Sequence, residues 1–266
     1  MVLKVGIAGV TGWTGNAVAQ AIATAEDMAL VFAVSSSAAG KCLREFQIES
    51  DLKILGSVDE ALSISTDVFV DYTSAASVKE HTLLALRKGM ATIVGSSGLN
   101  ADDFSEIEKL AKEKGVGVIA CGNFSITAAL AKHFSLVAAK YLPSWEIIDY
   151  ASASKMDAPS GTTRELAEAM ELVRHNKLGR EIKDVVGDSA ARGAQIKGTP
   201  VHSLRLPGYT LAFETLFGLP DERLAIRHDA GTSAAPYVDG TMLAMREVAK
   251  ISGLVRGLDQ LMFGTK

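Results

Sequence analysis

Hydrophobic and polar positions follow a regular order over about the first 120 residues of the chain. Five apolar runs are too short for helices and are bounded by turn residues, as buried strands are. They cover residues 2–8, 29–34, 68–71, 91–95 and 116–120. Helical spacing of apolar positions covers the intervening residues 16–24, 77–87 and 101–114. Strands that alternate with helices predict βαβ units and a parallel sheet.

This alternation stops after the fifth run. Helical spacing covers residues 126–139 and 161–174. Strand-like runs cover residues 145–151, 201–205, 211–217 and 224–228, an order that predicts an α+β second domain. The segment 175–200 lacks periodicity, which leaves two interpretations open, a mobile loop over a site or a disordered surface excursion. Residues 241–251 regain helical spacing and are expected to pack on the first domain.

Composition and charge exclude several classes of protein. The hydrophobic fraction is 48%, yet no apolar run approaches the roughly 20 residues that span a bilayer. The first residues lack the features of a signal peptide, so we expect a cytoplasmic protein with no membrane partner. A net charge of −4 without a basic run argues against a nucleic-acid partner. Cys42 and Cys121 have neither disulfide nor metal-ligand spacing, and we expect no metal site.

A glycine-rich loop directly follows the first predicted strand and opens the first helix. Gly9, Gly12 and Gly15 recur at three-residue spacing, with Trp13 and Thr14 between the last two. Glycine permits the tight turn and lets the backbone approach a pyrophosphate, whose charge is met by the helix N-terminus. The alternative is a purely structural turn. We interpret the loop as the dinucleotide site of a Rossmann domain.

The end of the second predicted strand bears on the choice of cofactor. An NAD-specific site usually has an acidic residue there, which accepts the ribose hydroxyls. This strand instead ends in Ser35 and Ser36, and Lys41 follows shortly after. Hydroxyls with a nearby cation favour NADPH over NADH, because they suit the additional 2′-phosphate. The alternative is that the serines form a polar turn.

Several further segments together resemble the dihydrodipicolinate reductase family, which acts in lysine biosynthesis. The segments Asp71-Tyr72-Thr73, Gly95-Ser96-Ser97-Gly98 and Gly122-Asn123-Phe124-Ser125 are similar to its Asp-Phe-Thr, Gly-Thr-Thr-Gly and Asn-Phe-Ser stretches. The resemblance spans nearly the whole chain. It implies that the cofactor is contacted by Tyr72, Thr73, Gly95, Ser96, Ser97, Asn123 and Phe124.

The most specific segment is Lys155-Met156-Asp157-Ala158-Pro159-Ser160-Gly161-Thr162, which resembles the family's carboxylate-binding stretch. A turn into a helix here presents N–H groups and hydroxyls from Ser160, Gly161 and Thr162, and Lys155 adds a positive charge. These residues and Ser152 are therefore our candidates for binding a small carboxylated substrate. The alternative is a capped helix with a solvated lysine.

The chain departs from the family where an adjacent His-His pair is expected to supply a proton. The aligned positions hold Ala151 and Ser152, and neither side chain is a suitable acid. Three explanations remain open. Tyr150 or Lys155, directly or through water, replaces the histidine in a genuine lysine-pathway reductase. Alternatively the substrate is a different imine that is already protonated, which is our main hypothesis. The third is a non-catalytic dinucleotide-binding sensor.

We also assign expected roles to four other polar residues. His81 and His133 lie on predicted helices, where a hydrogen-bonded or solvated imidazole is the expected role. Arg192 and Arg205 are candidates for a second substrate carboxylate.

We thus predict an α/β chain with an N-terminal Rossmann domain that has a parallel sheet at residues 1–122, joined by residues 240–266. An α+β domain with an open mixed sheet, for substrate binding and oligomerisation, is predicted at residues 123–239. The predicted activity is NAD(P)H-dependent hydride transfer to a small carboxylated imine or a conjugated C=N or C=C bond. The family resemblance implies a homotetramer built through the second domain.

Overall fold

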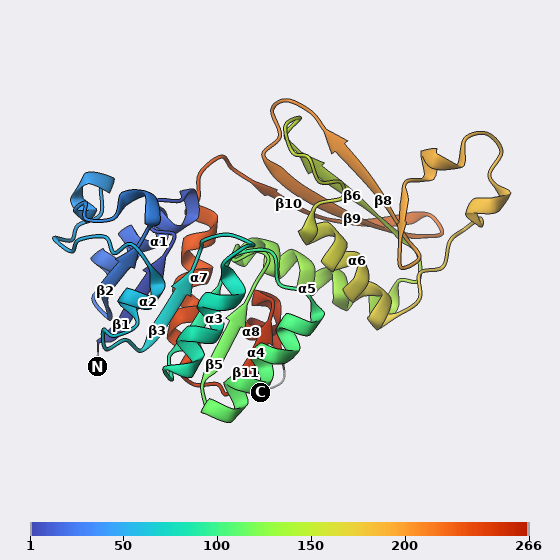
Figure 1. Cartoon of the computed structure of the whole chain (residues 1–266). Coiled ribbons are helices and arrows are strands. Elements are labelled where there is room, and N and C mark those ends of the chain that lie inside the picture. The colour runs from blue at the N-terminus through green and yellow to red at the C-terminus, as the bar shows by residue number, and fades with distance from the viewer. Residues whose placement is uncertain (1, 265–266) are drawn as a thin grey trace. The chain divides into compact units, whose positions relative to one another are not determined.

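The computed structural model describes residues 2–264, and the chain divides into two compact units. The first unit runs to Ile126 and resumes at Ala234, and the second unit is Thr127–Ser233. The predicted fold class is confirmed, because a parallel sheet forms in the first unit and a mixed sheet forms in the second (Figure 1).

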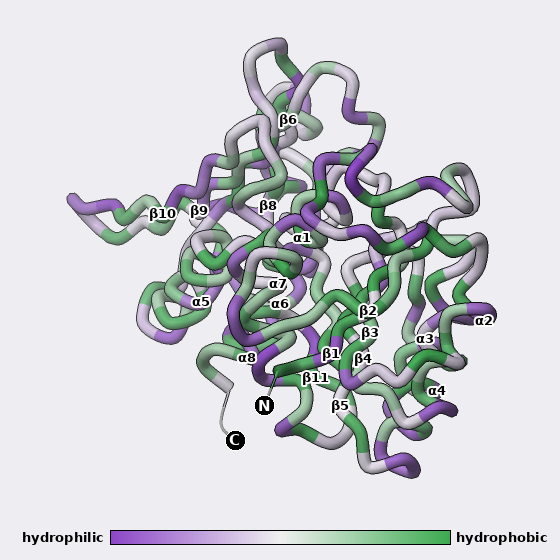
Figure 2. The backbone as a smooth tube through the Cα atoms, turned by 90° about the vertical axis from the view of Figure 1, so that its left-hand side faces the viewer, coloured by the Kyte–Doolittle hydropathy of each residue, from purple (hydrophilic) through white to green (hydrophobic). Residues whose placement is uncertain are grey.

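The first unit is built on a six-stranded parallel sheet of order β11-β5-β4-β3-β1-β2. Its strands are β1 (Leu3–Ala8), β2 (Met28–Val34), β3 (Val68–Asp71), β4 (Ala91–Val94), β5 (Gly117–Ala120) and β11 (Gly253–Arg256). Figure 2 shows β2, β3 and β4 as mainly hydrophobic segments, as expected for strands that are covered on both faces. β1 pairs with β2 on one side and with β3 on the other, so the strand order reverses at β1.

Helices cover both faces of this sheet. One face carries α1 (Trp13–Thr24), α7 (Ala235–Val248) and α8 (Leu258–Phe263). The opposite face carries α2 (Val58–Ala61), α3 (Val78–Arg87) and α4 (Ala101–Lys114), whose apolar side chains form two buried clusters with the strands. α4 begins as predicted, because the Asn100 side chain accepts hydrogen bonds from the Asp102 and Asp103 amides.

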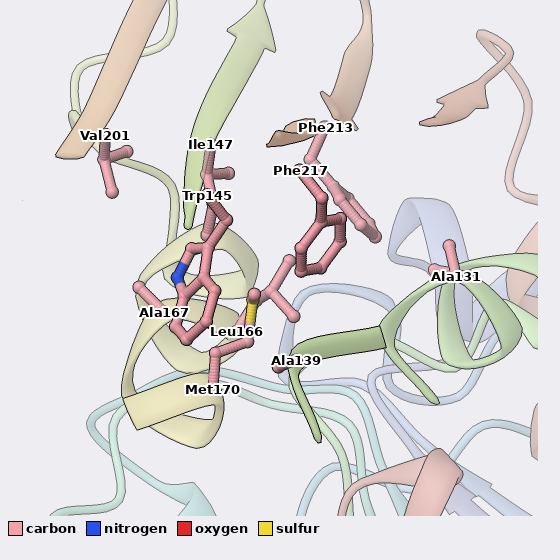
Figure 3. Close-up of a cluster of buried hydrophobic side chains, with 11 residues drawn as sticks. Ala131, Ala139, Trp145, Ile147, Leu166, Ala167, Met170, Val201, Phe213 and Phe217 are labelled. Atoms are coloured by element: carbon pink, nitrogen blue, oxygen red, sulfur yellow. The ribbon is translucent and has the colours of Figure 1, made fainter. Parts of the chain in front are cut away.

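The second unit has a five-stranded sheet of order β10-β9-β6-β8-β7, in which only β6 and β8 are parallel. The strands are β6 (Trp145–Ala151), β7 (Ala194–Ile196), β8 (Thr199–Arg205), β9 (Leu211–Leu219) and β10 (Glu222–Ala230). Two helices, α5 (Ile126–Tyr141) and α6 (Gly161–Val173), pack on one face around the buried ring of Trp145 (Figure 3). We call this the helix face. The other face of the sheet carries no helix within the described second unit, and we call it the open face.

Residues 175–200 are more ordered than their sequence suggests. They contain two 3₁₀ helices, Ile182–Asp184 and Ser189–Arg192, and the short edge strand β7. Asn176 is buried, and its side chain forms hydrogen bonds with both backbone groups of Trp145. Its Oδ1 accepts from the Trp145 amide at 3.0 Å, and its Nδ2 donates to the Trp145 carbonyl at 2.9 Å. Strand β11 and helix α8 were not predicted, because four to six residues carry too little periodicity.

Candidate dinucleotide and substrate sites

A pocket of about 480 Å³ lies at the carboxyl ends of β1, β2 and β3. Its lining comes from the loops after these strands and from the beginnings of α2 and α3: Gly9, Thr11, Gly12, Val34, Ser35, Ser36, Gly56, Ser57, Val58, Tyr72, Thr73, Ser74, Ser77 and His81. The strand order reverses at β1. Ligands of doubly wound sheets bind at such a switch point.

The three glycines of the loop have different steric roles. Gly9 has φ +85°, and a Cβ atom there would lie 2.2 Å from the Tyr72 carbonyl oxygen. A Cβ atom on Gly15 would lie 2.2 Å from the Gly9 carbonyl oxygen, so this glycine lets α1 pack closely on the loop. Gly12 lines the pocket and directly precedes α1, whose free N–H groups therefore lie beside it. This cradle of backbone fits a pyrophosphate.

The end of β2 presents hydroxyl groups to the same pocket. Ser35 and Ser36 line it, and the Thr11 and Ser35 hydroxyl oxygens are 2.8 Å apart. Asp and Glu are absent from the described residues of the lining. Lys41 is absent as well, because its ammonium nitrogen lies 5.9 Å from the centre of the Phe46 ring instead. The structure therefore does not bring the predicted cation to the pocket.

The buried carboxylate of Asp71 organises the loops after β3 and β4. Oδ1 accepts hydrogen bonds from the Thr73 amide at 3.0 Å, the Thr73 hydroxyl at 2.8 Å and the Ser96 hydroxyl at 2.6 Å. Oδ2 accepts one from His81 Nδ1 at 2.8 Å. Burial acts to raise the pKa of Asp71, but these bonds outweigh it and lower that pKa. An ionised carboxylate thus fixes Thr73 and His81 in the pocket wall.

Two predicted cofactor residues surround Tyr72 rather than the pocket. A Cβ atom on Gly95 would lie 2.2 Å from the Tyr72 ring, so the glycine makes room for that ring. The Phe124 ring meets the Tyr72 ring edge-on, with centroids 6.1 Å apart. The Tyr72 and Thr241 hydroxyl oxygens are 2.6 Å apart, and burial raises the pKa of Tyr72. These residues position Tyr72.

The other predicted cofactor residues also lie outside the lining. Trp13 is 56% exposed, and its ring packs edge-on against Tyr237. Thr14 is half-buried in the first turn of α1, and Ser97 is exposed. Asn123 Oδ1 accepts a hydrogen bond from the Ser125 amide at 2.8 Å, which is a local turn contact. Six of the predicted cofactor residues thus line the pocket: Gly9, Gly12, Ser35, Ser36, Tyr72 and Thr73.

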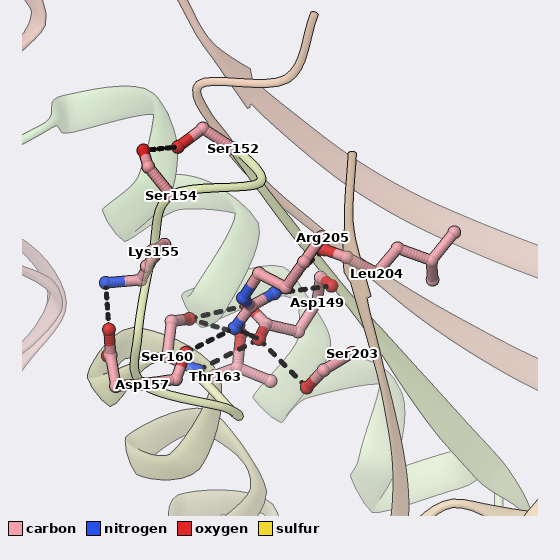
Figure 4. Close-up of polar contacts among 10 residues, drawn as sticks. All are labelled: Asp149, Ser152, Ser154, Lys155, Asp157, Ser160, Thr163, Ser203, Leu204 and Arg205. Carbon is pink, nitrogen blue, oxygen red and sulfur yellow. Dashed lines mark hydrogen bonds and ion pairs between the residues drawn. The ribbon is translucent and has the colours of Figure 1, made fainter. Parts of the chain in front are cut away.

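In the second unit, Asp149 organises the turn that begins α6 (Figure 4). Its buried carboxylate accepts hydrogen bonds from five donors: the Ser160 amide, the hydroxyls of Ser160, Thr163 and Ser203, and the Arg205 guanidinium at 2.7 Å. Burial acts to raise the pKa of Asp149, but the bonds from Ser160 and Arg205 outweigh it and lower that pKa.

This network holds Ser160, which the sequence suggested as a substrate-binding residue. Its amide and hydroxyl both donate to Asp149, at 2.9 and 2.6 Å, so neither is directed to a substrate. Gly161 is exposed and Thr162 is half-buried in the first turn of α6, where amides have no partner within the helix. The Gly161 and Thr162 amides are therefore the groups of this turn that are left for an anion.

Lys155 lies in the loop that leads from β6 to α6. Its ammonium is 2.7 Å from Asp157 Oδ1, and about a third of its side chain is exposed. Hydrogen bonding to Lys155 lowers the pKa of Asp157. The Ser152 and Ser154 hydroxyl oxygens are 2.9 Å apart in the same loop. The loop thus gathers one cation and two hydroxyls close to the beginning of α6.

Tyr150, a candidate acid from the sequence, lies on the open face of the sheet, opposite to α6. Adjacent residues of a strand point to opposite faces, and its neighbour Asp149 is on the helix face with α6. The Tyr150 hydroxyl donates to Glu214 at 2.9 Å, and Arg227 lies over its ring. Burial and the bond to Glu214 raise the pKa of Tyr150 to about 12. Both the position and the pKa argue against proton donation at α6.

The two arginines suggested for a second carboxylate are already paired within the chain. Arg205 is bound to Asp149, and it also donates to the Asp157 carbonyl at 2.7 Å. Arg192 and His202 both contact Glu146, with His202 Nε2 2.7 Å from Glu146 Oε2. These groups support the second unit's own structure.

Sequence reasoning missed several lining residues of the dinucleotide pocket. Ser74 and Ser77 follow the end of β3, and their place at the carboxyl end of a parallel strand was a usable signal. His81 lies one helical turn after Ser77, so both belong to the same side of α3. Residues 56–58 approach the pocket through the bridge between Leu55 and Val34, a contact that no local pattern predicts.

Across residues 2–264, the structure has no helix long and apolar enough to cross a membrane. Within that same range, no group of three or more His, Cys, Asp or Glu side chains is arranged to hold a metal ion.

Two family models together match nearly the whole chain. The model for the dihydrodipicolinate reductase N-terminus matches residues 3–124, and that for the C-terminus matches residues 124–262. A 4-hydroxy-tetrahydrodipicolinate reductase from Halalkalibacterium halodurans is 36% identical over 97% of this chain and 99% of its own length. One from Enterococcus faecalis is 33% identical over 98% of this chain and 100% of its own.

Solved structures agree with these relatives. A dipicolinate-bound dihydrodipicolinate reductase from Paenisporosarcina sp. TG-14 has a TM-score of 0.85 at 30% identity, covering 98% of this chain and 100% of its own. An amine dehydrogenase from Mycobacterium smegmatis, at 12% identity and a TM-score of 0.66 over 97% of this chain and 95% of its own, shares the fold alone. The chain therefore belongs to the dihydrodipicolinate reductase family and is an NAD(P)H-dependent oxidoreductase.

Proposed function

We propose that this protein reduces the lysine-pathway intermediate 4-hydroxy-tetrahydrodipicolinate, with NADPH as the preferred cofactor. The observation that carries this proposal is the beginning of α6, where the Gly161 and Thr162 amides lie next in sequence to a loop that presents Lys155. Such a site suits a carboxylate. Relatives named for this reaction match along the whole chain, and the related structure from Paenisporosarcina holds dipicolinate, a dicarboxylate.

This proposal replaces our main hypothesis from the sequence, which was a different imine substrate. That hypothesis becomes the second candidate, and the observation in its favour is that Ala151 and Ser152 occupy the positions of the family's histidines. The sensor alternative is not retained, because the family consists of reductases.

The first unit supplies the cofactor site. The bound dinucleotide provides the hydride. The backbone around Gly9 and Gly12 and the beginning of α1 would hold its pyrophosphate, and the hydroxyls of Thr11, Ser35 and Ser36 would meet the adenosine ribose. The lack of a carboxylate in the described lining supports NADPH. Calorimetric titration of both dinucleotides tests this, and tighter binding of NADH would contradict it.

The second unit supplies the substrate site. Lys155 would exchange Asp157 for a substrate carboxylate, which also accepts hydrogen bonds from the first amides of α6. Tyr150 is directed to Glu214 on the open face, so of the donors considered from the sequence we assign the proton to Lys155 or to water. The hydroxyls of Ser152 and Ser154 would help to hold such a water.

The two candidate functions are separated by measuring kcat/KM with NADPH on several substrates. These are 4-hydroxy-tetrahydrodipicolinate, cyclic imino acids, and imines formed from keto acids and amines. We expect the highest value for 4-hydroxy-tetrahydrodipicolinate. A higher value for another imine would favour the second candidate.

We also propose a cytoplasmic homotetramer assembled through the open face. Ile148, Leu204 and Leu216 place aliphatic side chains on that face among ion pairs, and α5 and α6 cover only the helix face. Burial of these side chains between copies would remove apolar surface from water.

A further inference from the structure

The dinucleotide pocket contains one side chain that is able to carry a positive charge. Its described lining consists of glycines, serines, threonines and valines, together with Tyr72 and His81. A dinucleotide brings a pyrophosphate, and NADPH adds a 2′-phosphate. The beginning of α1 offers only partial charges. His81 is therefore the only residue of this lining whose protonation would add a full positive charge near a bound phosphate.

The contact with Asp71 determines which nitrogen of His81 is left for another partner. Nδ1 donates to Asp71 Oδ2 at 2.8 Å, and the carboxylate is fully buried. Thr73 and Ser96 hold the carboxylate in place. Since Nδ1 carries the hydrogen, Nε2 is the ring nitrogen that is left to contact a ligand. The ring is partly exposed, and Nε2 has no hydrogen-bond partner within residues 2–264. A neutral Nε2 is an acceptor and repels a phosphate oxygen, whereas a protonated Nε2 donates to one.

We propose that His81 contacts a phosphate of the bound dinucleotide through a protonated Nε2, so that binding takes up a proton, and that Asp71 positions the ring. This inference rests on the proposed use of the pocket for NADPH. It adds a residue for which the sequence suggested no role in binding. It predicts that dinucleotide affinity falls as the pH rises, because loss of the Nε2 proton removes the charged donor.

The charged groups around α3 are paired with other side chains, are exposed or lie away from the pocket, so His81 is our candidate for the phosphate contact. Asp71 at the end of β3 is the group in direct contact. On α3 itself, Lys79 lies between the carboxylates of Asp103 and Glu106 on α4, at 2.8 and 2.9 Å. Glu80 is exposed, and Arg87 lies in the last turn of α3. Across the pocket, Glu60 on α2 accepts a hydrogen bond from the Gly56 amide at 3.3 Å. Among these groups, only Asp71 is paired with the His81 ring.

The test is calorimetric titration of NADH and NADPH between about pH 6 and 8 in phosphate and Tris buffers. Their different ionisation enthalpies give the number of protons taken up on binding. NADH is essential because it lacks the 2′-phosphate, which itself titrates near pH 6. Uptake with both dinucleotides would place His81 at the pyrophosphate, and uptake with NADPH alone would place it at the 2′-phosphate.

The comparison variant is His81→Gln, which keeps a hydrogen-bonding side chain but no titration. At pH 6 the unmodified protein should bind roughly tenfold more tightly than the variant, as expected for a charged hydrogen bond. The variant should show no proton uptake attributable to the protein. His175→Gln is the matched control, because His175 also pairs with a carboxylate, Glu171, but lies exposed on the second unit. It should behave as the unmodified protein does.

Asp71→Asn tests the positioning role, with the NMR signals of the His81 ring as readout. In the unmodified protein, dinucleotide binding should shift these signals, and in Asp71→Asn both this shift and the proton uptake on binding should be smaller. If Asp71→Asn does not fold, the His81→Gln comparison still decides the central claim. Equal proton uptake and equal pH profiles for the unmodified protein and His81→Gln would overturn the inference alone. An unmodified protein that binds neither dinucleotide would overturn the proposed function as well.

Discussion

At the scale of single residues, the candidate cofactor site depends on the space that glycines leave free at the loop after β1. Gly12 lines the pocket, and the nearest atom to a Cβ there would be the Gly9 carbonyl oxygen at 3.2 Å. A small side chain at this position therefore requires only a shift of a few tenths of an ångström in the Gly9 backbone, but it occupies the space that a pyrophosphate requires.

We predict that Gly12→Asp folds and loses dinucleotide binding, because its carboxylate would repel the pyrophosphate at the beginning of α1. Calorimetric titration with NADPH measures the loss, and circular dichroism checks the fold. A folded variant with unchanged affinity would remove the loop from the site.

Lys155 gives the second prediction at this scale. Lys155→Met should raise KM for the substrate by roughly tenfold to a hundredfold, as expected for a charged hydrogen bond of about 1.5–3 kcal/mol. The variant also leaves Asp157 without its cation. NADPH affinity should not change, since Lys155 belongs to the second unit. Steady-state kinetics that are indifferent to the substitution would refute the carboxylate site.

The two positions of the missing histidines should respond differently. Ser152 is half-buried in the loop after β6, so Ser152→His has space to add an acid and should raise kcat if proton donation limits the reaction. Ala151 is fully buried, so Ala151→His should mainly cost stability, by about 1–3 kcal/mol. Kinetics and urea unfolding measure the two effects. A kcat for Ser152→His equal to that of the unmodified protein would show that proton donation is not limiting.

At the scale of secondary-structure elements, Asp149 joins β6, β8 and α6. Its carboxylate accepts hydrogen bonds from Ser160 and Thr163 on the α6 side and from Ser203 and Arg205 on β8. Loss of this charge would leave the half-buried Arg205 without its counter-ion. Removing one partner of such a pair is strongly destabilising.

We predict that Asp149→Asn lowers the free energy of unfolding by about 3–5 kcal/mol at pH 7. The pKa of Asp149 is lower in the folded protein than its unfolded value of about 3.9, so this stabilisation is complete above that pH and is lost as the pH falls through the folded value. The unmodified protein should therefore lose more stability below about pH 4 than the variant does. Urea unfolding at several pH values measures this, and parallel pH profiles would contradict it.

At the scale of the whole molecule, the open face of the second sheet is the expected site of assembly. Leu216 lies on this face, paired with Ala225 on β10 and Glu146 on β6. A charge buried between copies without a partner is costly, so we predict that Leu216→Lys dissociates the tetramer. Light scattering after gel filtration gives the mass. Leu172→Lys, at an 89% exposed leucine of α6, is the control and should remain tetrameric. A monomeric unmodified protein would contradict the assembly.

The sequence by itself determined the order of the longer helices and strands, the glycine loop and the turn into α6, because these depend on periodicity and backbone conformation within short segments. The short elements α2, β7, β11 and α8 were not determined in this way. Only the tertiary structure decided which side chains meet. Asp71 and His81 come from different elements, and Asp149 and Arg205 are 56 residues apart. The same contacts directed Ser160 to Asp149 and placed Tyr150 on the open face. Local sequence cannot give these outcomes, because a side chain's partner depends on which distant segment packs against it.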